Sequence, residues 1–535
     1  MKKLYREWLS VSTKYITDEP FSIKFQYSCL SIILLFTLAI RLVSIDIPAL
    51  DRTMWKEIDY ITISTNYLQN GFNFFQPEIT WPAEPPRITA MELPLVPYMA
   101  AIFYALFGFN SLTVRLIPLL SFLLMAIYIF RLAKREMNSM VGLIAALAAS
   151  VFPLYHQFGN ILFSEPIVIA MSVMAIFHFA QWMDTGQKKD VVIAVFAFSM
   201  AVSLKLTPLY MLLPLTWLAY RKYGLNLKSY FKLLAPLTLS LLLPIVWYSY
   251  AYFLTFNSID VFGIFQGHDK MQTFTYLTRS FWYKKMFYRI AQGVLGGNLG
   301  FLLFVIGFMS GFACLKRTGL FYIYAMMIAI FFAIVAEGQI DAPYRQLTSI
   351  PFLAVFVSLG IIALFSVYQS MLQLVNSSAA EQHSYLSKKQ LLLSFGIVLL
   401  ILVFNYKAIL HADPLEPSHK EEWRMAHEIK KIASDNAKII ALGAYTIHKG
   451  GNDLSPVLYY YTGLRGWTLQ ENEWQQETVE RYIQKGASLL AAPLDRPREP
   501  GLKPFVQSLQ KRYAVLYKNT EKNQILLDLT HLPVN

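Results

Sequence analysis

Three carboxylates lie in one polar stretch near the start of the chain, where their spacing could support acid–base chemistry. Glu57 and Asp59 are two residues apart in WKEIDYITISTNYLQ, and Glu92 follows in MELPLVPY. Acids held close together raise one another's pKa, and a carboxylate tuned in this way can accept a proton from a reacting group. Such acids could also hold a divalent cation, although no ligand spacing requires one. The alternative is that Glu57 and Asp59 are solvated surface acids and that Glu92 is a favourable acid at a helix N-terminus.

Basic side chains interleaved with aromatic ones form a second candidate group, in residues 255–293. They are His268, Lys270, Arg279, Lys284, Lys285 and Arg289, beside Phe281, Trp282, Tyr283 and Tyr288. Arg binds a phosphate through paired N–H groups and Lys binds it as a point charge, so this stretch could hold an anion. It could equally anchor the chain among lipid headgroups. Lys205 stands apart, because a Lys within the apolar stretch 191–220 is costly unless it lines a polar cavity or snorkels.

Two further polar residues lie where one apolar run ends and the next begins. His156 is near the end of one run, and Glu165 precedes Pro166 at the expected start of the next helix. Both could line a binding cleft. The alternative is that Glu165 is an acid of the first helical turn and that His156 hydrogen-bonds within a loop.

The composition indicates a membrane protein. Of 535 residues, 55% are hydrophobic and 15% are charged, and the mean hydropathy is +0.41; soluble domains carry about 25% charged residues. An ordinary soluble enzyme and a disordered chain are therefore excluded. The formal net charge of +13 is more typical of helix orientation and anionic lipid contact than of nucleic-acid binding, so no nucleic-acid partner is expected. Cys29 and Cys314 both lie in apolar runs, which predicts neither a disulfide framework nor a zinc site.

Eleven apolar runs predict transmembrane helices, since a span needs about 20 apolar residues. Basic residues before the first run predict a cytoplasmic N-terminus by the positive-inside rule. The later basic loops share that side only if the short run 93–107 does not cross, so this run is predicted to be an interfacial helix on the outer face. The eleven spans are 25–45, 112–132, 141–158, 162–183, 191–204, 206–220, 230–253, 294–315, 320–335, 347–368 and 391–410.

This arrangement predicts a transmembrane core over 1–410, with outer loops at 46–110 and 255–293, and an outer domain over 411–535. In the first loop, Ile58, Ile61, Thr65 and Leu68 recur at helical spacing and predict an amphipathic helix over Trp55–Gln69. The tail is polar and mixes strand and helix patterns, which predicts a small α/β domain. Its expected strands are 438–442, 457–462 and 524–529, and its expected helices are 421–434 and 477–485.

Motifs in a fixed order connect these segments. The two acids of the first loop precede Glu92 with Pro94 and Tyr98, an LFG at 106–108, Arg115–Leu116 and a helix that ends in basic residues 131–135. Later come Glu165–Pro166, Lys205, the APYRQLTSIP segment with Tyr344, Arg345 and Gln346, and LYYYTGLRGW at 458–467. This order resembles the GT-C glycosyltransferases over nearly the whole chain. It is most similar to the family of bacterial protein O-mannosyltransferases and lipid A aminoarabinose transferases.

The resemblance implies an α-helical polytopic membrane protein of the GT-C type, with about eleven transmembrane helices, interfacial helices in the first outer loop and a small C-terminal α/β domain. It implies transfer of a sugar from a polyprenyl-phosphate-linked donor to an acceptor on the outer face, by an inverting displacement. It also implies the bacterial inner membrane, with a periplasmic C-terminal domain. No cofactor beyond the lipid-linked donor is firmly implied, and a divalent metal stays open. Secreted protein hydroxyls, lipid A phosphates and envelope glycans all remain open as acceptors.

The resemblance also implies roles for the candidate residues. The family's adjacent Asp-Glu pair here reads Lys56-Glu57, so the base is Asp59 or Glu57; the W-x-E-x-D form favours Asp59. Glu92 would orient the acceptor or the base, and His156 and Glu165 would line the acceptor cleft. In the APYRQ segment, Ala342 replaces the family's His and Arg345 its second Tyr. The lipid phosphate is expected to meet Lys205, His268, Lys270, Arg279, Tyr344, Arg345 and Gln346.

Two other classes of protein compete with this interpretation. A transporter or lipid flippase would place charges near the middle of the membrane in two matching halves, whereas these acids lie in outer loops and no internal repeat is evident. A scaffold for envelope assembly would not need acids and cations gathered on one face. No Gly-rich nucleotide loop stands in a strand–helix context, which argues against a cytoplasmic nucleotide-sugar donor.

Overall fold

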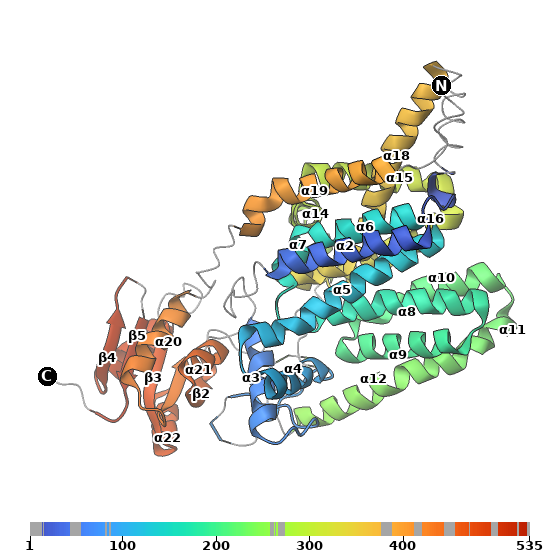
Figure 1. The fold of residues 1–535 in the computed structure, drawn as a ribbon. Coiled ribbons are helices and arrows are strands. Elements are labelled where there is room, and N and C mark those ends of the chain that lie inside the picture. The colour runs from blue at the N-terminus through green and yellow to red at the C-terminus, as the bar shows by residue number, and fades with distance from the viewer. Residues whose placement is uncertain are drawn as a thin grey trace.

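A computed structural model describes residues 13, 15–42, 55–80, 83–84, 87–256, 262, 264–265, 273–375, 388–410, 420–442, 455–469, 471–493, 501–521 and 524–531. These residues form a bundle of helices with a small α/β domain at one end of it (Figure 1). The predicted fold class is therefore confirmed.

Within the described residues, eleven helices of the bundle correspond to the predicted spans, and other helical segments connect them. The eleven are α2 (Ile23–Leu42), α5 (Ser111–Glu136), α6 (Ser139–Val151), α8 (Glu165–Thr185), α9 (Lys188–Leu204), α10 (Leu212–Tyr223), α12 (Leu234–Thr255), α15 (Asn298–Gly311), α16 (Leu315–Ile334), α18 (Ile350–Val375) and α19 (Lys388–Leu410). The connecting α-helices are α3 (Trp55–Gln69), α4 (Leu95–Phe107), α7 (Pro153–Phe158), α11 (Leu227–Tyr230), α13 (Thr273–Leu277), α14 (Ser280–Tyr288) and α17 (Ala336–Asp341). The 3₁₀ or π segments are η1 (Thr207–Met211), η2 (Phe231–Leu233), η4 (Arg289–Val294), η5 (Phe312–Cys314) and η6 (Pro343–Ser349).

Each predicted span is mainly helical over its described residues, although not every one is long. In the described part of the chain, 7 stretches are at least 18 residues long and apolar enough to cross a membrane. One of them, Asn298–Ile334, contains both α15 and α16. These two helices fold back on each other, because the Thr318 hydroxyl donates to the carbonyl of Gly311 at 2.8 Å and the Tyr322 hydroxyl donates to that of Phe308.

The predicted spans 141–158, 191–204 and 206–220 correspond to shorter helices. The first is divided into α6 and α7 at Phe152, because the residue before Pro153 is driven out of the helical conformation. The other two correspond to α9 and to η1 with α10, and they meet at Lys205.

Helices α15 and α18 cross with their backbones almost in contact. A side chain at Gly307 would overlap the carbonyl of Phe356, and one at Gly360 would overlap the carbonyl of Leu303. Small residues allow this approach inside a membrane, where van der Waals packing rather than water exclusion holds helices together. The pair therefore forms a closely packed seam on one side of the bundle.

The C-terminal domain is a five-stranded sheet with helices on both faces. The strands are β1 (Lys438–Leu442), β2 (Arg465–Leu469), β3 (Ala487–Pro493), β4 (Ala514–Asn519) and β5 (Gln524–Asp528), in the order β2-β1-β3-β5-β4, with β1 parallel to both neighbours. Alternate residues of β1 point to opposite faces. Ile440 packs against α22 (Gln476–Gln484) and α23 (Leu502–Gln510), and Ile439 packs against α20 (Lys420–Ile432) and α21 (Ser455–Thr462).

One expected strand of this domain is wrong. Residues 457–462 form most of α21, a helix, and not a strand. The run VLYYYT has high β propensity, but packing decides its structure. Leu458 and Tyr459 are buried against the sheet, while Val457, Tyr460 and Tyr461 pack against the first loop of the bundle.

Helix α3 lies across the end of the bundle that faces the C-terminal domain (Figure 1). Its bounds are those that the sequence predicts. The predicted apolar stripe is present, with Ile58 and Ile61 buried, but Tyr60, Ile63 and Tyr67 are buried too. The helix is enclosed because α4 and α21 both pack against it. The expectation of a helix with one solvated face is therefore wrong for its first three turns.

Candidate active site

Glu92 accepts hydrogen bonds from two side chains of α3. Its Oε1 lies 2.7 Å from Lys56 Nζ and 2.8 Å from the Tyr60 hydroxyl. Lys56 and Tyr60 are four residues apart, so they project from the same side of the helix. The Glu92 segment is fixed by two neighbouring contacts, because Trp247 Nε1 donates to the carbonyl of Met91 and the Leu93 N–H donates to that of Ser203.

The charges of this pair stabilise each other. Burial alone would raise the pKa of Glu92, but attraction to Lys56 and then to Lys205 lowers it below its usual value. Burial alone would lower the pKa of Lys56, but Glu92 raises it. Both groups are consequently charged at neutral pH, in a place where Glu92 is only 5% exposed.

Lys205 forms a second ion pair, with Glu165. Lys205 directly follows the last residue of α9, and Glu165 is the first residue of α8. The Lys205 ammonium contacts Glu165 Oε1 and lies 5.3 Å from the centre of the Tyr344 ring. Lys205 therefore lies between α9 and η1 and not in the middle of a helix. Its side chain is 22% exposed.

These two ion pairs belong to one group of charges, which we call the lysine–glutamate cluster: Lys56, Glu92, Lys205 and Glu165. Lys205 contributes to the pKa of Glu92, and Tyr344 contributes to that of Lys56, so the members influence one another electrostatically. Two ammonium groups with two carboxylate partners can exchange those partners for the oxygens of a phosphate. The cluster could therefore bind an anion through its two lysines, which Glu92 and Glu165 neutralise in its absence.

Glu57 faces a different set of partners. It is 2% exposed, accepts a hydrogen bond from the Leu162 N–H at 3.0 Å, and lies 4.0 Å from the Arg115 guanidinium. The charges of Glu57 and Arg115 both influence the pKa of Tyr460 and of Tyr461 on α21. Burial, and then Glu57, raise the pKa of Tyr460 to about 12. The C-terminal domain therefore covers the Glu57–Arg115 pair.

Asp59 is also buried, at 1% exposed. It follows Lys56 by three residues, which places the two on neighbouring positions of one helix side. Neither Asp59 nor Glu57 is the solvated surface acid of the alternative interpretation, because α4 and α21 enclose the helix that carries them.

The remaining candidates divide between the cluster and other places. Tyr344 lies beside Lys205. Gln346 is buried and donates to the side chain of Gln339 at 2.7 Å, so it ties η6 to α17. Arg345 is half-buried against Gly338 of α17. Arg279 is exposed.

His156 is half-buried on α7. His268 and Lys270 lie outside the described residues. Within the described ranges, no group of three or more His, Cys, Asp or Glu could hold a metal ion.

Lys56, Tyr60 and Arg115 are site residues to which the sequence assigns no role. A signal exists for each of them. Lys56 and Tyr60 share the four-residue spacing of one helix side. Arg115 opens an apolar helix, where a cation is costly unless it has a partner.

The bundle, the enclosed helix of the first loop and the small terminal domain together make the GT-C fold of membrane glycosyltransferases. Residues 86–248, which include Glu92, Glu165 and Lys205, match the family model described as dolichyl-phosphate-mannose-protein mannosyltransferase. The resemblance seen in the motifs is thereby confirmed. No sequence among curated proteins matches the chain.

Solved structures share the fold at low identity. ArnT from Cupriavidus metallidurans bound to undecaprenyl phosphate has a TM-score of 0.66 and 13% identity, over 94% of this chain and 99% of that one. The Archaeoglobus fulgidus oligosaccharyltransferase AglB, in complex with an inhibitory peptide and a dolichol-phosphate, has a TM-score of 0.53 and 13% identity, over 96% and 75%. The arabinofuranosyltransferase AftD from Mycobacteria has a TM-score of 0.52 and 10% identity, over 97% and 40%.

Proposed function

We propose that this protein is a glycosyltransferase that moves a sugar from a polyprenyl-phosphate-linked donor to an acceptor at the bundle end that carries the C-terminal domain. The observation that supports this most directly is the lysine–glutamate cluster, with buried Asp59 on the adjoining helix. Similar folds have been solved with undecaprenyl phosphate and with a dolichol-phosphate. A phosphate on a lipid is a ligand that the two ammonium groups of this cluster could bind in place of their carboxylate partners.

In the proposed reaction, the bond between the anomeric carbon and the phosphate oxygen breaks, and its electron pair leaves with the lipid phosphate. Lys56 and Lys205 would stabilise the negative charge that develops there. Tyr344, beside Lys205, would position that ammonium group. Glu92 and Glu165 would release the lysines as the phosphate arrives and would then lie near the positive charge of the sugar ring.

The acceptor oxygen forms the new bond to the anomeric carbon from the opposite face, and its proton passes to a carboxylate. We assign this base to Asp59. The W-x-E-x-D form of the first loop favours Asp59, and Glu57, which accepts from a backbone N–H and lies near Arg115, is the alternative. A base must have a lone pair directed at the acceptor hydroxyl in order to take its proton.

We place the acceptor between the first loop and the C-terminal domain, where Tyr460 and Tyr461 meet Glu57. Protein hydroxyls, lipid A phosphates and envelope glycans remain the candidates for the acceptor. Because Glu165 pairs with Lys205, we now assign it to the phosphate side and leave His156 as the candidate for the acceptor cleft. A periplasmic C-terminal domain on a bacterial inner-membrane protein, with a cytoplasmic N-terminus, completes the proposal.

The test uses the purified full chain in lipid nanodiscs with a polyprenyl-phosphate sugar. Release of polyprenyl phosphate that requires an added acceptor, and that is lost in Asp59→Asn, supports the proposal. The competing function is a lipid flippase, which would move the donor between leaflets of a proteoliposome without cleaving it. Movement without cleavage in the presence of each acceptor class would reject the enzyme.

A further inference from the structure

An apolar groove lies in the bundle away from the lysine–glutamate cluster. It encloses a cavity of about 100 Å³ between α8, α9, α10 and α12. Its lining includes Phe179 from α8, Val191 and Val195 from α9, and Tyr230 and Leu233 from the connection into α12. Leu237 of its lining is exposed, as are Val192 and Leu234 beside it, so in a membrane-spanning bundle the groove would open toward the hydrocarbon of the bilayer.

The three hydroxyl groups in the lining of this groove all donate to backbone carbonyls. Thr216 donates to the carbonyl of Leu212 at 2.7 Å, Ser240 to that of Pro236 at 2.7 Å, and Tyr230 to that of Gly224 at 3.0 Å. Because each hydroxyl already has a partner, the groove presents an essentially apolar surface. A hydrocarbon chain fits such a surface, whereas a polar ligand would lose hydrogen bonds there.

The rim of the groove is basic. Lys188 is one helical turn before Val191, and Lys228 and Lys232 flank Tyr230 and Leu233; all three lysines are exposed. Figure 1 places α11, which contains Lys228, at the bundle end far from the C-terminal domain. The lysines therefore stand where lipid headgroups of that leaflet would lie.

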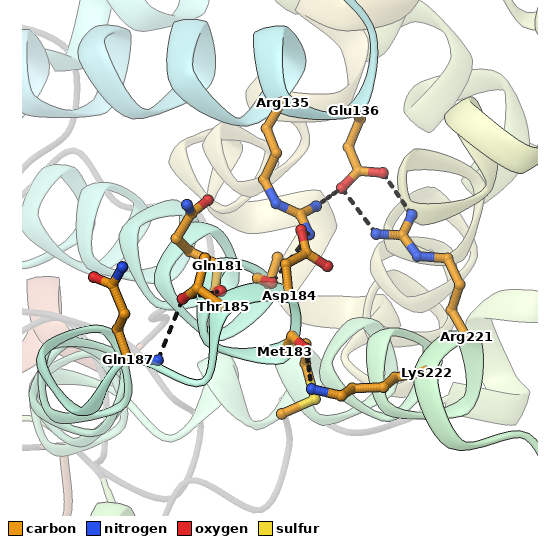
Figure 2. Close-up of polar contacts among 10 residues, drawn as sticks. Arg135, Glu136, Gln181, Met183, Asp184, Thr185, Gln187, Arg221 and Lys222 are labelled. Carbon is orange, nitrogen blue, oxygen red and sulfur yellow. Dashed lines mark hydrogen bonds and ion pairs between the residues drawn. The ribbon is translucent and has the colours of Figure 1, made fainter.

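The acids of the neighbouring helix ends have partners away from Lys228 and Lys232. Figure 2 shows Glu136 between Arg135 and Arg221, with Arg221 at 2.6 and 3.2 Å, and Asp184 against Arg135. Asp190 is hydrogen-bonded to His178 at 2.8 Å and follows Lys188 and Lys189, which offset its charge. Residues 191–256 contain no Asp or Glu, so the charges of Lys228 and Lys232 are available to an anionic group.

We propose that this groove binds one anionic phospholipid of the leaflet far from the C-terminal domain. One acyl chain would fill the space along Val195, and the phosphate would contact Lys228 and Lys232. The inference depends on the membrane placement of the bundle and is independent of the proposed glycosyl transfer. The basic rim is a poor match for the sugar carrier's phosphate, because Lys188 and Lys205 stand at opposite ends of α9, about 25 Å apart along the helix.

The experiment is native mass spectrometry of the full chain released from nanodiscs made of equal parts phosphatidylglycerol and phosphatidylcholine. We expect retained phosphatidylglycerol to exceed phosphatidylcholine by about tenfold or more, since each Lys near a membrane surface favours an anionic lipid. Lys228→Gln with Lys232→Gln should abolish that preference. Lys316→Gln with Arg317→Gln removes the same charge from another exposed turn and should retain it.

A second pair of variants tests the groove itself. Val195→Trp fills the space, and we expect it to lose the retained lipid, whereas Val192→Trp, on an exposed position of the same helix, should keep it. Equal retention of both lipids by the wild type would overturn the proposal. So would unchanged retention in Val195→Trp, or displacement of the lipid by equimolar polyprenyl phosphate, which would make the carrier's chain the occupant.

Discussion

Lys56 Nζ lies 2.7 Å from Glu92 Oε1, although the two residues are 36 positions apart in the chain. The ion pair joins the first-loop helix to the segment that leads into α4, and Lys205 adds a second positive charge to the field at Glu92. A carboxylate in this position stabilises the empty site and competes with any phosphate that enters it. This competition leads to the first prediction.

Glu92→Gln should bind polyprenyl phosphate more tightly than the wild type, while transferring sugar more slowly. The neutral amide no longer competes for Lys56, but it also no longer stabilises positive charge on the sugar. Lys56→Gln should weaken the same binding by about tenfold or more, the value of a charge-assisted hydrogen bond. Binding can be measured by tryptophan fluorescence in nanodiscs. Lys485→Gln, which breaks an exposed pair with Glu84, is the control and should change neither quantity.

Substitutions of the two acids of α3, Asp59 and Glu57, should affect different properties of the protein. Asp59→Asn should reduce transfer by roughly 10²-fold or more with polyprenyl phosphate binding intact, as expected for loss of a general base. Glu57→Gln should act mainly on stability, because it weakens a contact with buried Arg115, and losing a buried partner can cost about 3–5 kcal/mol. Transfer rate and the unfolding temperature in detergent distinguish the two. If Glu57→Gln alone abolished transfer at an unchanged unfolding temperature, the base would be Glu57.

The Lys56–Glu92 pair should make stability depend on pH on the acidic side. The pKa of Glu92 is lowered in the folded protein. Its contribution is therefore complete above the unfolded-state value, about 4.3, and is lost as the pH falls through the lower folded value. The unfolding temperature of the wild type should exceed that of Glu92→Gln near pH 7, and the two should converge under strongly acidic conditions. A constant gap across the whole range would show that Glu92 is not charged in the folded state.

The C-terminal domain should influence acceptor use through α21. Tyr461→Ala should raise the KM for the acceptor by about tenfold, since an aromatic contact of this size contributes on the order of 1 kcal/mol or more, and should leave polyprenyl phosphate binding unchanged. Tyr517→Ala, on β4 of the same domain, is the matched control. Equal effects of both substitutions on the acceptor KM would indicate a general loss of domain stability and would contradict a direct role for Tyr461.

Local patterns predict the helices well, because a helix is specified by residues close in sequence. Trp55–Gln69 is a helix with the predicted bounds, and each predicted span is mainly helical over its described residues. The pattern fails at 457–462, where aromatic and β-branched residues favour a strand but burial on two sides, against the sheet and against α3, produces a helix.

The pairings within the site could not be read from the sequence for a related reason. Glu165 and Lys205 belong to different helices, and only the way in which α8 and α9 pack brings Lys205 to Glu165. Glu57 and Asp59 are two positions apart in the sequence, and only tertiary packing places Glu57 against the Leu162 N–H and near Arg115. Which partner each charge receives depends on tertiary packing.

The glycine-lined crossing of α15 and α18 has a consequence for the route by which a long lipid reaches Lys205. Where two backbones touch at Gly307 and Gly360, no isoprenoid unit can slip between them. The lipid-linked donor of the proposed reaction would therefore enter through another side of the bundle. Two residues without side chains, Gly307 and Gly360, would thus restrict the direction from which the lipid approaches.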